Sequence, residues 1–187
     1  MRPSYVQTEK PQTPPVTTDE VMQAAQIDAE EDHKQIEGLI DAATRYVEKK
    51  LWTQLVTAEW EMRLPCFPCE VIELHPNPVQ EAEVSCVNTA GQTVSLVEGT
   101  DFEVDTNCQP AVIRPCYGKS WPTVRGHAND VVITLTCGYG AAFDVPPNIK
   151  EAIKVIVSHW FSGCGDSSSI PMAADAMLSA DSYAGFV

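Results

Sequence analysis

The sequence predicts an α+β protein: a small helical bundle with an inserted antiparallel β sub-domain and extended terminal arms. Apolar residues recur at helical spacing before residue 52 and again after residue 146. Between these stretches the hydrophobic period changes to two, in short runs separated by turn residues. Prolines near the start and a Gly/Ser-rich stretch near the end mark the two arms.

The first 52 residues predict an arm followed by two helices. Residues 1–16 hold four prolines among polar residues, which predicts an extended arm with no core of its own. Thr17 and Glu20 have the spacing of a capping box, so a short helix should run to about Gln26. A longer helix should follow to about Lys50, and residues 17–52 form the first part of the bundle. Its apolar stripe comprises Ile36, Leu39, Ile40, Ala43, Val47 and Leu51.

Residues 53–145 predict the inserted β sub-domain. Apolar and charged residues alternate over residues 58–64, which is typical of a half-buried strand. Turn residues such as Asn88 and Gly91 separate the runs that follow. Further strands are predicted at about residues 71–74, 82–87, 93–97, 111–114 and 131–137.

Residues 146–163 complete the predicted bundle. Pro146 and Pro147 favour a helix start. Its apolar stripe, which should face the stripe of the earlier long helix, comprises Ile149, Ala152, Ile153, Ile156, Val157 and Trp160. Residues 164–187 are predicted to form a Gly/Ser linker and a tail. The apolar residues of that tail should be exposed in a lone monomer unless a partner covers them.

Composition narrows the classes of function. The 187-residue chain has a formal net charge of −14. Such a surface repels nucleic-acid phosphates and anionic membranes, although DNA could still pass it without binding. The start of the sequence shows no apolar signal-peptide core, and no stretch approaches the ~20 apolar residues of a membrane helix. We therefore expect a soluble protein made in a cytoplasm.

The seven cysteines raise the question of a metal or redox site. Cys66 and Cys69 form a single C-x-x-C, which is a weak zinc or redox signal by itself. His75, or Cys108 with Cys116, could complete a zinc site only if the fold gathers them. Since the surroundings predict strand and turn, we interpret these cysteines as ordinary thiols and expect no metal and no cofactor.

No catalytic pattern stands out. Gly118-Lys119-Ser120 resembles the end of a phosphate-binding loop, but Ile113 occupies the position where that motif needs its first glycine. The four histidines show no metal-ligand spacing, and no nucleophile elbow is present. The sequence therefore predicts a protein that is not an enzyme.

Four segments of the sequence carry a joint resemblance: residues 36–48, residues 117–122, residues 136–140, and residues 147–153 with His159 and Trp160. Together they resemble the head-tail connector (head-completion adaptor) proteins of tailed phages. In order, they are similar to the second helix of those proteins, to two turns of their β insertion and to their last core helix. The order and spacing also match, over about residues 17–162.

The resemblance implies a structural adaptor in the neck of a virion, assembled in the host bacterial cytoplasm. Copies of the chain would form a ring, typically twelve-fold, beneath the portal protein. The ring would extend the channel for passing genomic DNA, without sequence-specific binding, and present a platform to the next neck or tail protein. No membrane is involved. Candidate contacts to the portal or a neighbouring subunit lie in the tail: Met177, Leu178, Tyr183, Phe186 and Val187.

Three other functions remain open at this point. A stopper or tail-terminator protein would be richer in β structure and would lack the two helices before the insertion. A small metal- or thiol-dependent protein would be built on Cys66 and Cys69. A host-recognition β module would expose an aromatic platform, whereas the aromatic residues here fall mostly on core-phase positions.

Overall fold

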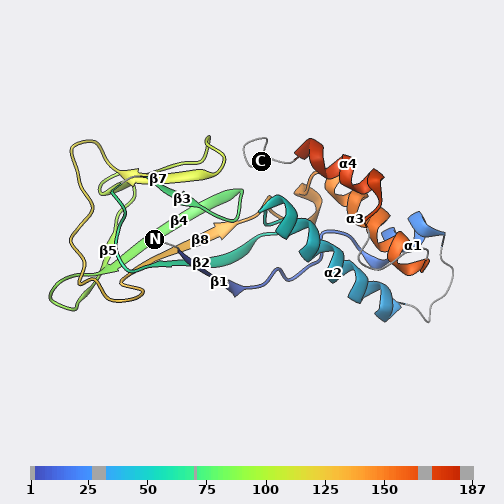
Figure 1. Cartoon of the computed structure of the whole chain (residues 1–187), viewed down its shortest axis with the longest axis horizontal. Helices are drawn as coiled ribbons and strands as arrows, with labels where there is room; N and C mark the ends of the chain where they lie inside the picture. Colours follow the sequence, from blue (N-terminus) through green and yellow to red (C-terminus); the bar gives the residue numbers. More distant parts are fainter. Residues whose placement is uncertain (1–2, 27–32, 70, 164–169, 182–187) are drawn as a thin grey trace. The chain divides into compact units, whose positions relative to one another are not determined.

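The structure, a computed structural model, describes residues 3–26, 33–69, 71–163 and 170–181. It combines helices with antiparallel sheets, which confirms the predicted α+β class. The chain divides into two compact units (Figure 1). The β unit comprises Met1–Lys10 and Thr57–Gly138, and the helical unit comprises Pro11–Val56 and Tyr139–Val187. Within the described ranges, no helix is long and apolar enough to cross a membrane.

A five-stranded antiparallel sheet forms most of the β unit, with the strand order β1-β2-β8-β4-β5. The strands are β1 (Ser4–Glu9), β2 (Ala58–Leu64), β8 (Val131–Cys137), β4 (Val79–Val87) and β5 (Thr93–Leu96). Along the central strand β8, every second side chain is buried and the ones between are half-buried. This alternation is the period of two that the sequence shows, and it gives the sheet one core face and one outer face.

A smaller sheet supplies the other side of this core. It has the order β3-β7-β6, formed by β3 (Ile72–Leu74), β7 (Ala111–Pro115) and β6 (Phe102–Asp105). Phe102 and Ile113 from this sheet share one apolar cluster with Ile133 and Leu135 of β8. Asn77 is buried beside it, and its side-chain oxygen accepts a hydrogen bond from the Ala111 backbone N–H at 3.2 Å. The polar group is therefore satisfied inside the core.

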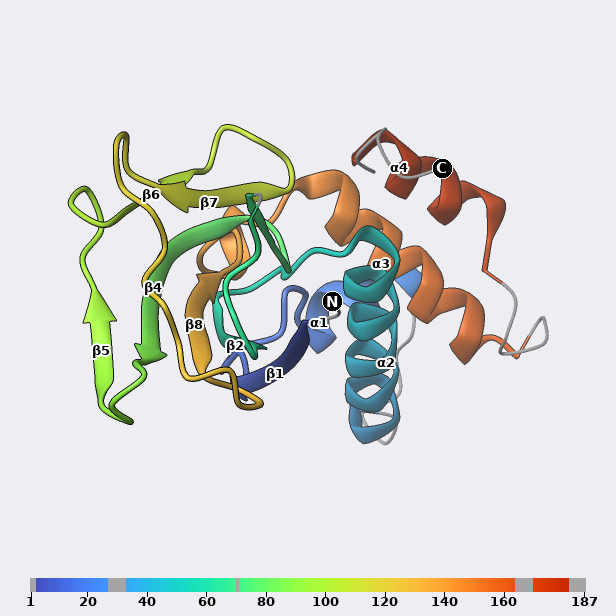
Figure 2. The ribbon, with the colours of Figure 1, turned by 60° about the vertical axis from the view of Figure 1, so that its left-hand side comes forward.

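The beginning of the chain differs from the arm predicted for residues 1–16. Residues 4–9 form β1, which pairs antiparallel with β2 at one edge of the larger sheet (Figures 1 and 2). Pro3 and Pro11 bracket this segment, but the run between them contains no proline and can pair along its length. Tyr5 packs against the β core, and Val16 is fully buried in the helical unit.

In the described part of the helical unit there are four α-helices, of which α3 contacts each of the others (Figure 2). They are α1 (Thr18–Ala25), α2 (His33–Leu51), α3 (Pro147–Phe161) and α4 (Met172–Asp181). The predicted capping box is confirmed: Thr17 N–H donates to Glu20 Oε2 at 2.8 Å, and Glu20 N–H donates to Thr17 Oγ1 at 3.3 Å.

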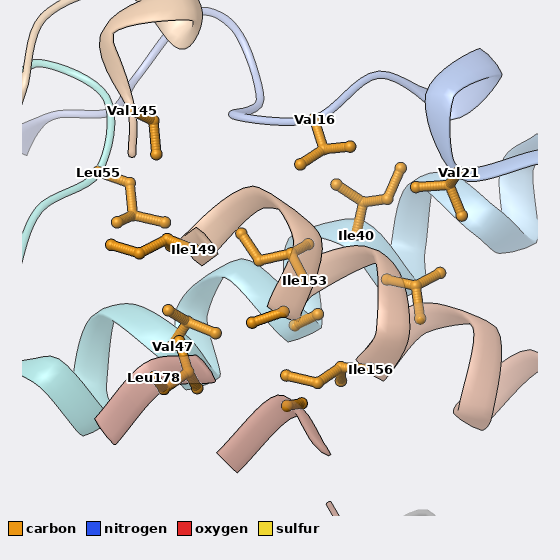
Figure 3. Packing of buried hydrophobic residues seen from close by; sticks show 14 of the residues in the cluster. Val16, Val21, Ile40, Val47, Leu55, Val145, Ile149, Ile153, Ile156 and Leu178 are labelled. Atoms are coloured by element: carbon orange, nitrogen blue, oxygen red, sulfur yellow. The ribbon is translucent and has the colours of Figure 1, made fainter. Parts of the chain in front are cut away.

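The two apolar stripes predicted for the long helices meet in one core (Figure 3). Ile40 and Val47 of α2 and Ile153 and Ile156 of α3 are all buried there. Leu39 belongs to the same stripe but is only partly buried at the margin of the cluster. The stripe spacing therefore located the core correctly but did not distinguish its centre from its margin.

Residues 172–181 do not form the exposed tail that the sequence predicts. They form α4, whose Ala174 and Leu178 are fully buried in the helical core. These two residues are four apart, so they lie on one face of the helix. Met172, at the start of α4, is 89% exposed. The prediction of exposure holds for Met172 and is wrong for Leu178.

The carboxylate of Glu48 holds the chain where α2 ends. Trp52 has a left-handed backbone (φ 52°), and the chain then turns back toward Glu48. Glu48 Oε1 accepts hydrogen bonds from Gln54 Nε2 at 2.7 Å and from the Leu55 N–H at 3.1 Å. Burial, opposed in part by the Leu55 hydrogen bond, raises the pKa of Glu48 to about 7. This carboxyl is therefore easier to bury neutral than ionised.

We expect the substitution Ile153→Ala to lower the free energy of unfolding by about 2–5 kcal/mol, because it leaves a cavity among fully buried side chains. Leu39→Ala should cost less, since Leu39 is partly exposed. Urea denaturation monitored by helical circular dichroism measures both. Equal losses for the two variants would contradict the core described here.

We expect Glu48→Gln to change how stability depends on pH. The folded pKa of Glu48 lies above its unfolded value, so its contribution is fully present below about pH 4.5 and is lost as pH rises through about 7. The variant should match the wild type near pH 4.5 and be more stable near pH 8, by about 1–3 kcal/mol. Glu37→Gln, at an exposed position of the same helix, is the matched control and should not reproduce the gain near pH 8.

Candidate interaction surfaces

The residues considered for a metal site are distributed over separate turns of the β unit. Cys66 is half-buried and Cys69 is exposed in the segment between β2 and β3. His75 follows β3, Cys108 lies in the turn between β6 and β7, and Cys116 follows β7. Within the described ranges, the structure gathers no group of three or more His, Cys, Asp or Glu side chains that could hold a metal ion.

The environments of the thiols also bear on their reactivity. Burial raises the pKa of Cys137 to about 12, and burial also raises the pKa of Cys86. The exposed Cys108 donates its S–H to Asp105 Oδ2 at 3.4 Å, and this hydrogen bond raises the pKa of the Cys108 thiol. A raised pKa reduces the fraction of thiolate, which is the nucleophilic form. These three cysteines therefore do not have activated thiols.

The C-x-x-C segment contains a packing residue between its cysteines. Phe67 stacks on Trp121, with ring centroids 4.5 Å apart and an interplanar angle of 4°. The stack attaches the loop between β7 and β8 to the segment that follows β2. Trp121 is therefore a packing residue of this loop.

The turn that resembles a phosphate-binding loop is not followed by a helix. Gly118 has a left-handed backbone (φ 76°), and Lys119 N–H donates to the Cys116 carbonyl at 2.9 Å in a tight turn after β7. Lys119 Nζ lies 3.9 Å from Asp101 Oδ1. A phosphate-binding loop needs the N-terminus of a helix at this place, and the chain continues instead in an irregular loop, which agrees with the rejection of that motif from the sequence.

The structure separates the candidate contact residues of the C-terminal tail. Leu178 is fully buried and Met177 is partly buried against the helical core, so Leu178 is not available to a partner. Tyr183, Phe186 and Val187 lie outside the described residues. The hydrophobic periodicity of the sequence could not distinguish the buried residues of the tail from the exposed ones. The burial of Leu178 depends on the packing of α4 on α3.

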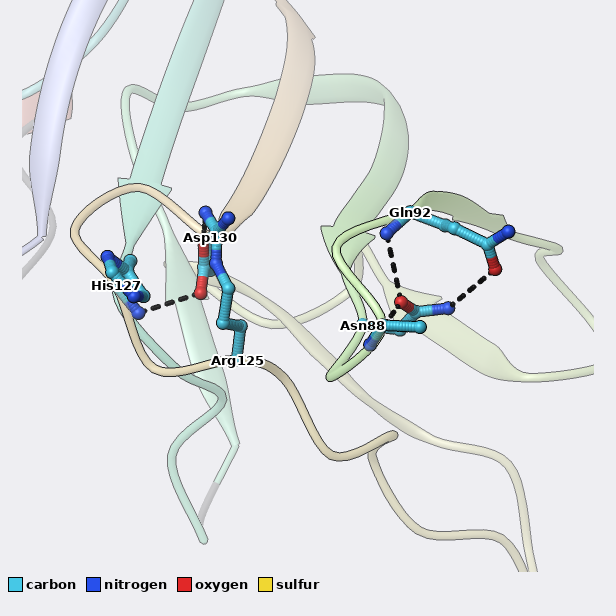
Figure 4. A network of polar contacts seen from close by, with 6 residues as sticks. Asn88, Gln92, Arg125, His127 and Asp130 are labelled. Atoms are coloured by element: carbon cyan, nitrogen blue, oxygen red, sulfur yellow. Dashed lines mark hydrogen bonds and ion pairs between the residues drawn. The ribbon is translucent and has the colours of Figure 1, made fainter.

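Two adjoining turns are held by side chains at one end of the larger sheet (Figure 4). Asp130 is 1% exposed and accepts hydrogen bonds from Arg125 Nη2 at 2.8 Å and from the His127 N–H at 2.7 Å. The Arg125 hydrogen bond holds the pKa of Asp130 below its usual range. In the neighbouring hairpin, Asn88 Oδ1 accepts from the N–H groups of Ala90 and Gln92. Both turns are therefore ordered by local hydrogen bonds and present a fixed backbone to solvent.

Glutamates cover the outer face of the larger sheet. In the strand register, Glu59 and Glu81 flank Thr136 of the central strand, and Glu61 and Glu83 flank Thr134. Arg63 forms an ion pair with Glu61 at 2.6 Å. The excess of acidic groups gives this face the negative charge that the composition predicts, and such a face disfavours contact with nucleic-acid phosphates.

The same sheet ends in two open edges. Within the described part of the chain, β1 pairs only with β2, and β5 pairs only with β4. Residues 4–8 and residues 93–97 carry no charge. Val6 at one edge is 44% exposed, and at the other edge Val94 is 39% exposed and Val97 is 58% exposed. Unpaired edges with exposed apolar side chains are candidate surfaces for another chain.

No protein-family model and no curated protein sequence matches the chain. Solved structures do match over almost the full length. The chain is similar to one in the neck of an empty gene transfer agent (GTA) particle computed with C6 symmetry, at TM-score 0.81 and 13% identity, covering 98% of this chain and 97% of that one.

Two further structures agree. A chain in the virion of the native GTA particle matches at TM-score 0.80 and 13% identity, covering 98% and 97% of the two chains. A chain in the neck of the native GTA particle computed with C12 symmetry matches at TM-score 0.71 and 14% identity, covering 97% of each. At these identities the similarity shows a shared fold, and both units of this chain therefore have the fold of chains from GTA particle structures, two of them particle necks.

Proposed function

We propose that the chain is a structural adaptor in the neck of a phage or phage-like particle, where a ring of copies lies beneath the portal and joins head to tail. The observation that carries the proposal is the fold similarity to chains of GTA neck structures over 98% of this chain at TM-score 0.81. A match of this extent includes both units, so it does not rest on one common motif. The resemblance of residues 17–162 to head-tail connector proteins points to the same place in a particle.

The order of the elements favours an adaptor over a stopper or tail terminator. Two helices, α1 and α2, precede the β strands from β2 onward, and α3 completes the bundle after them. Stopper and terminator proteins are expected to be richer in β structure and to lack helices at this position. Within the described ranges, Cys66 and Cys69 are not part of any group of three or more His, Cys, Asp or Glu side chains, which gives no support to a metal-dependent activity.

Ring formation and passage of DNA are parts of the same proposal. The two matched necks were computed with C6 and C12 symmetry, and a twelve-membered ring fits both orders. Each copy carries a formal net charge of −14. A channel wall built from such subunits would repel the phosphates of DNA, which would let the genome slide past without being held.

Deleting the gene for this chain from the phage or phage-like genome that carries it should yield DNA-filled heads and free tails that do not join. Electron microscopy of the lysate measures this, and the gene supplied in trans should restore joined particles. The purified chain, mixed with the two free components, should cosediment with heads, since an adaptor binds the portal. Cosedimentation with tails would identify a terminator instead, and joined particles without the gene would refute a neck function.

We further propose that Tyr183, Phe186 and Val187 contact the portal or a neighbouring subunit. Truncation after Asp181 removes them and keeps α4, whose Leu178 is part of the helical core. The truncated chain should keep the thermal unfolding midpoint of the wild type and lose cosedimentation with free heads. Truncation before α4 is the informative comparison, because it removes Leu178 and should also lower stability. Unchanged binding to heads after truncation at Asp181 would exclude this contact.

A further inference from the structure

The hydrogen-bonding phase of β5 leaves part of its backbone facing outward. Asn88 N–H donates to the Gln92 carbonyl at 2.9 Å across the hairpin that joins β4 to β5. Along an antiparallel ladder, hydrogen-bonded and non-hydrogen-bonded residue pairs alternate. Counted from the Asn88–Gln92 pair, the pairs Cys86–Val94 and Val84–Leu96 are hydrogen-bonded. The N–H and C=O groups of Thr93 and Ser95 therefore point away from β4, toward the open edge.

In this sheet the inner strands carry most of the charged residues, whereas in most sheets the edge strands carry them. Edge strands of monomeric proteins commonly carry lysine, other charged residues or proline, which discourage pairing with another chain. Here the inner strands β2 and β4 carry the glutamates, whereas residues 4–8 and 93–97 at the two edges carry neither charge nor proline. β1 ends on Glu9, but the rest of β1 and the whole of β5 are uncharged in a chain of net charge −14, a pattern that suits edges which pair with another chain.

We propose that β5 of one copy pairs with β1 of the next copy, so that the larger sheet continues from subunit to subunit. This inference rests on the proposed ring and names the surface that closes it. Pairing between unlike edges repeats head to tail, which is the arrangement that generates a ring, whereas pairing of β5 with β5 is two-fold and stops at a dimer. The partner at each edge is therefore a second copy of this chain.

Side chains at both edges fit such a joint. Val6 is paired with Glu61 and so lies on the outer face of the sheet, and Val94 is paired with the buried Cys86 and so lies on the core side. Pairing across the joint would reduce the exposure of both valines. Main-chain hydrogen bonds would supply the remaining affinity, as in other cases of strand addition to a sheet edge.

Two single substitutions close one edge each. Ser95→Pro removes an N–H that faces outward, so the pairing of β5 with β4 is kept while the open edge loses a donor. Ser95→Lys is a second way to close the same edge if the proline variant does not fold. Val6→Lys places a charge on β1, next to Glu61 on the outer face. Thr134→Lys, on the same face of the central strand, is the matched control.

Native mass spectrometry and light scattering should show rings for the wild type and for Thr134→Lys, and monomers for each edge variant alone. An equimolar mixture of Ser95→Pro and Val6→Lys should give a heterodimer, because each variant keeps the edge that the other lacks. Circular dichroism confirms that the variants are folded. Rings from either edge variant, a monomeric mixture, or homodimers of Val6→Lys would each overturn the inference.

These experiments distinguish a wrong β5–β1 pairing from a wrong neck function. If an edge variant forms rings and joins heads to tails, the adaptor function stands and another surface closes the ring. A wild-type chain that stays monomeric but still joins heads to tails also counts against the edge pairing. If deletion of the gene leaves head-tail joining intact, the neck function itself is wrong, whatever the edges do.

Discussion

The antiparallel pairing of β2 with β8 is the contact on which the β unit depends. Seven consecutive pairs, from Ala58 with Cys137 to Leu64 with Val131, bring together the two ends of the segment inserted between the long helices. With its ends paired, the insertion places every second residue of β8 in the core and adds β4 on the other side. A shift of one residue would turn the apolar set outward, so the burial of that set fixes the register.

The two units differ in the residues that they expose. Among its described residues, the helical unit buries most of its apolar stripes, and the large apolar groups it exposes are Trp52, Phe143 and Met172. The β unit carries glutamates on its inner strands β2 and β4, whereas residues 4–8 of β1 and the whole of β5 are uncharged. The acidic sheet face and the apolar edges therefore offer different surfaces to other molecules.

Local signals in the sequence predicted local structure well, and nonlocal pairing limited the rest. The capping box of Thr17 and the stripes of α2 and α3 depend on residues within a few positions of one another, and the structure contains them. Strand β1 was missed because its partner β2 lies far along the chain. Helix α4 follows α3 directly, but its apolar residues form no clear stripe, so the sequence did not reveal that it packs on α3. The edge position of β5 could not be predicted either, since the order of strands in a sheet is a property of the whole topology.

Both cores consist almost entirely of aliphatic side chains, and the buried polar residues of the described chain are only Thr53, Gln54, Asn77 and Asp130. Aliphatic cores tolerate exchange among residues of similar volume so long as the hydrophobic pattern is kept. Few positions therefore demand one particular amino acid. Such a fold can diverge in sequence until family models no longer detect it, while the path of its backbone stays the same over nearly its whole length.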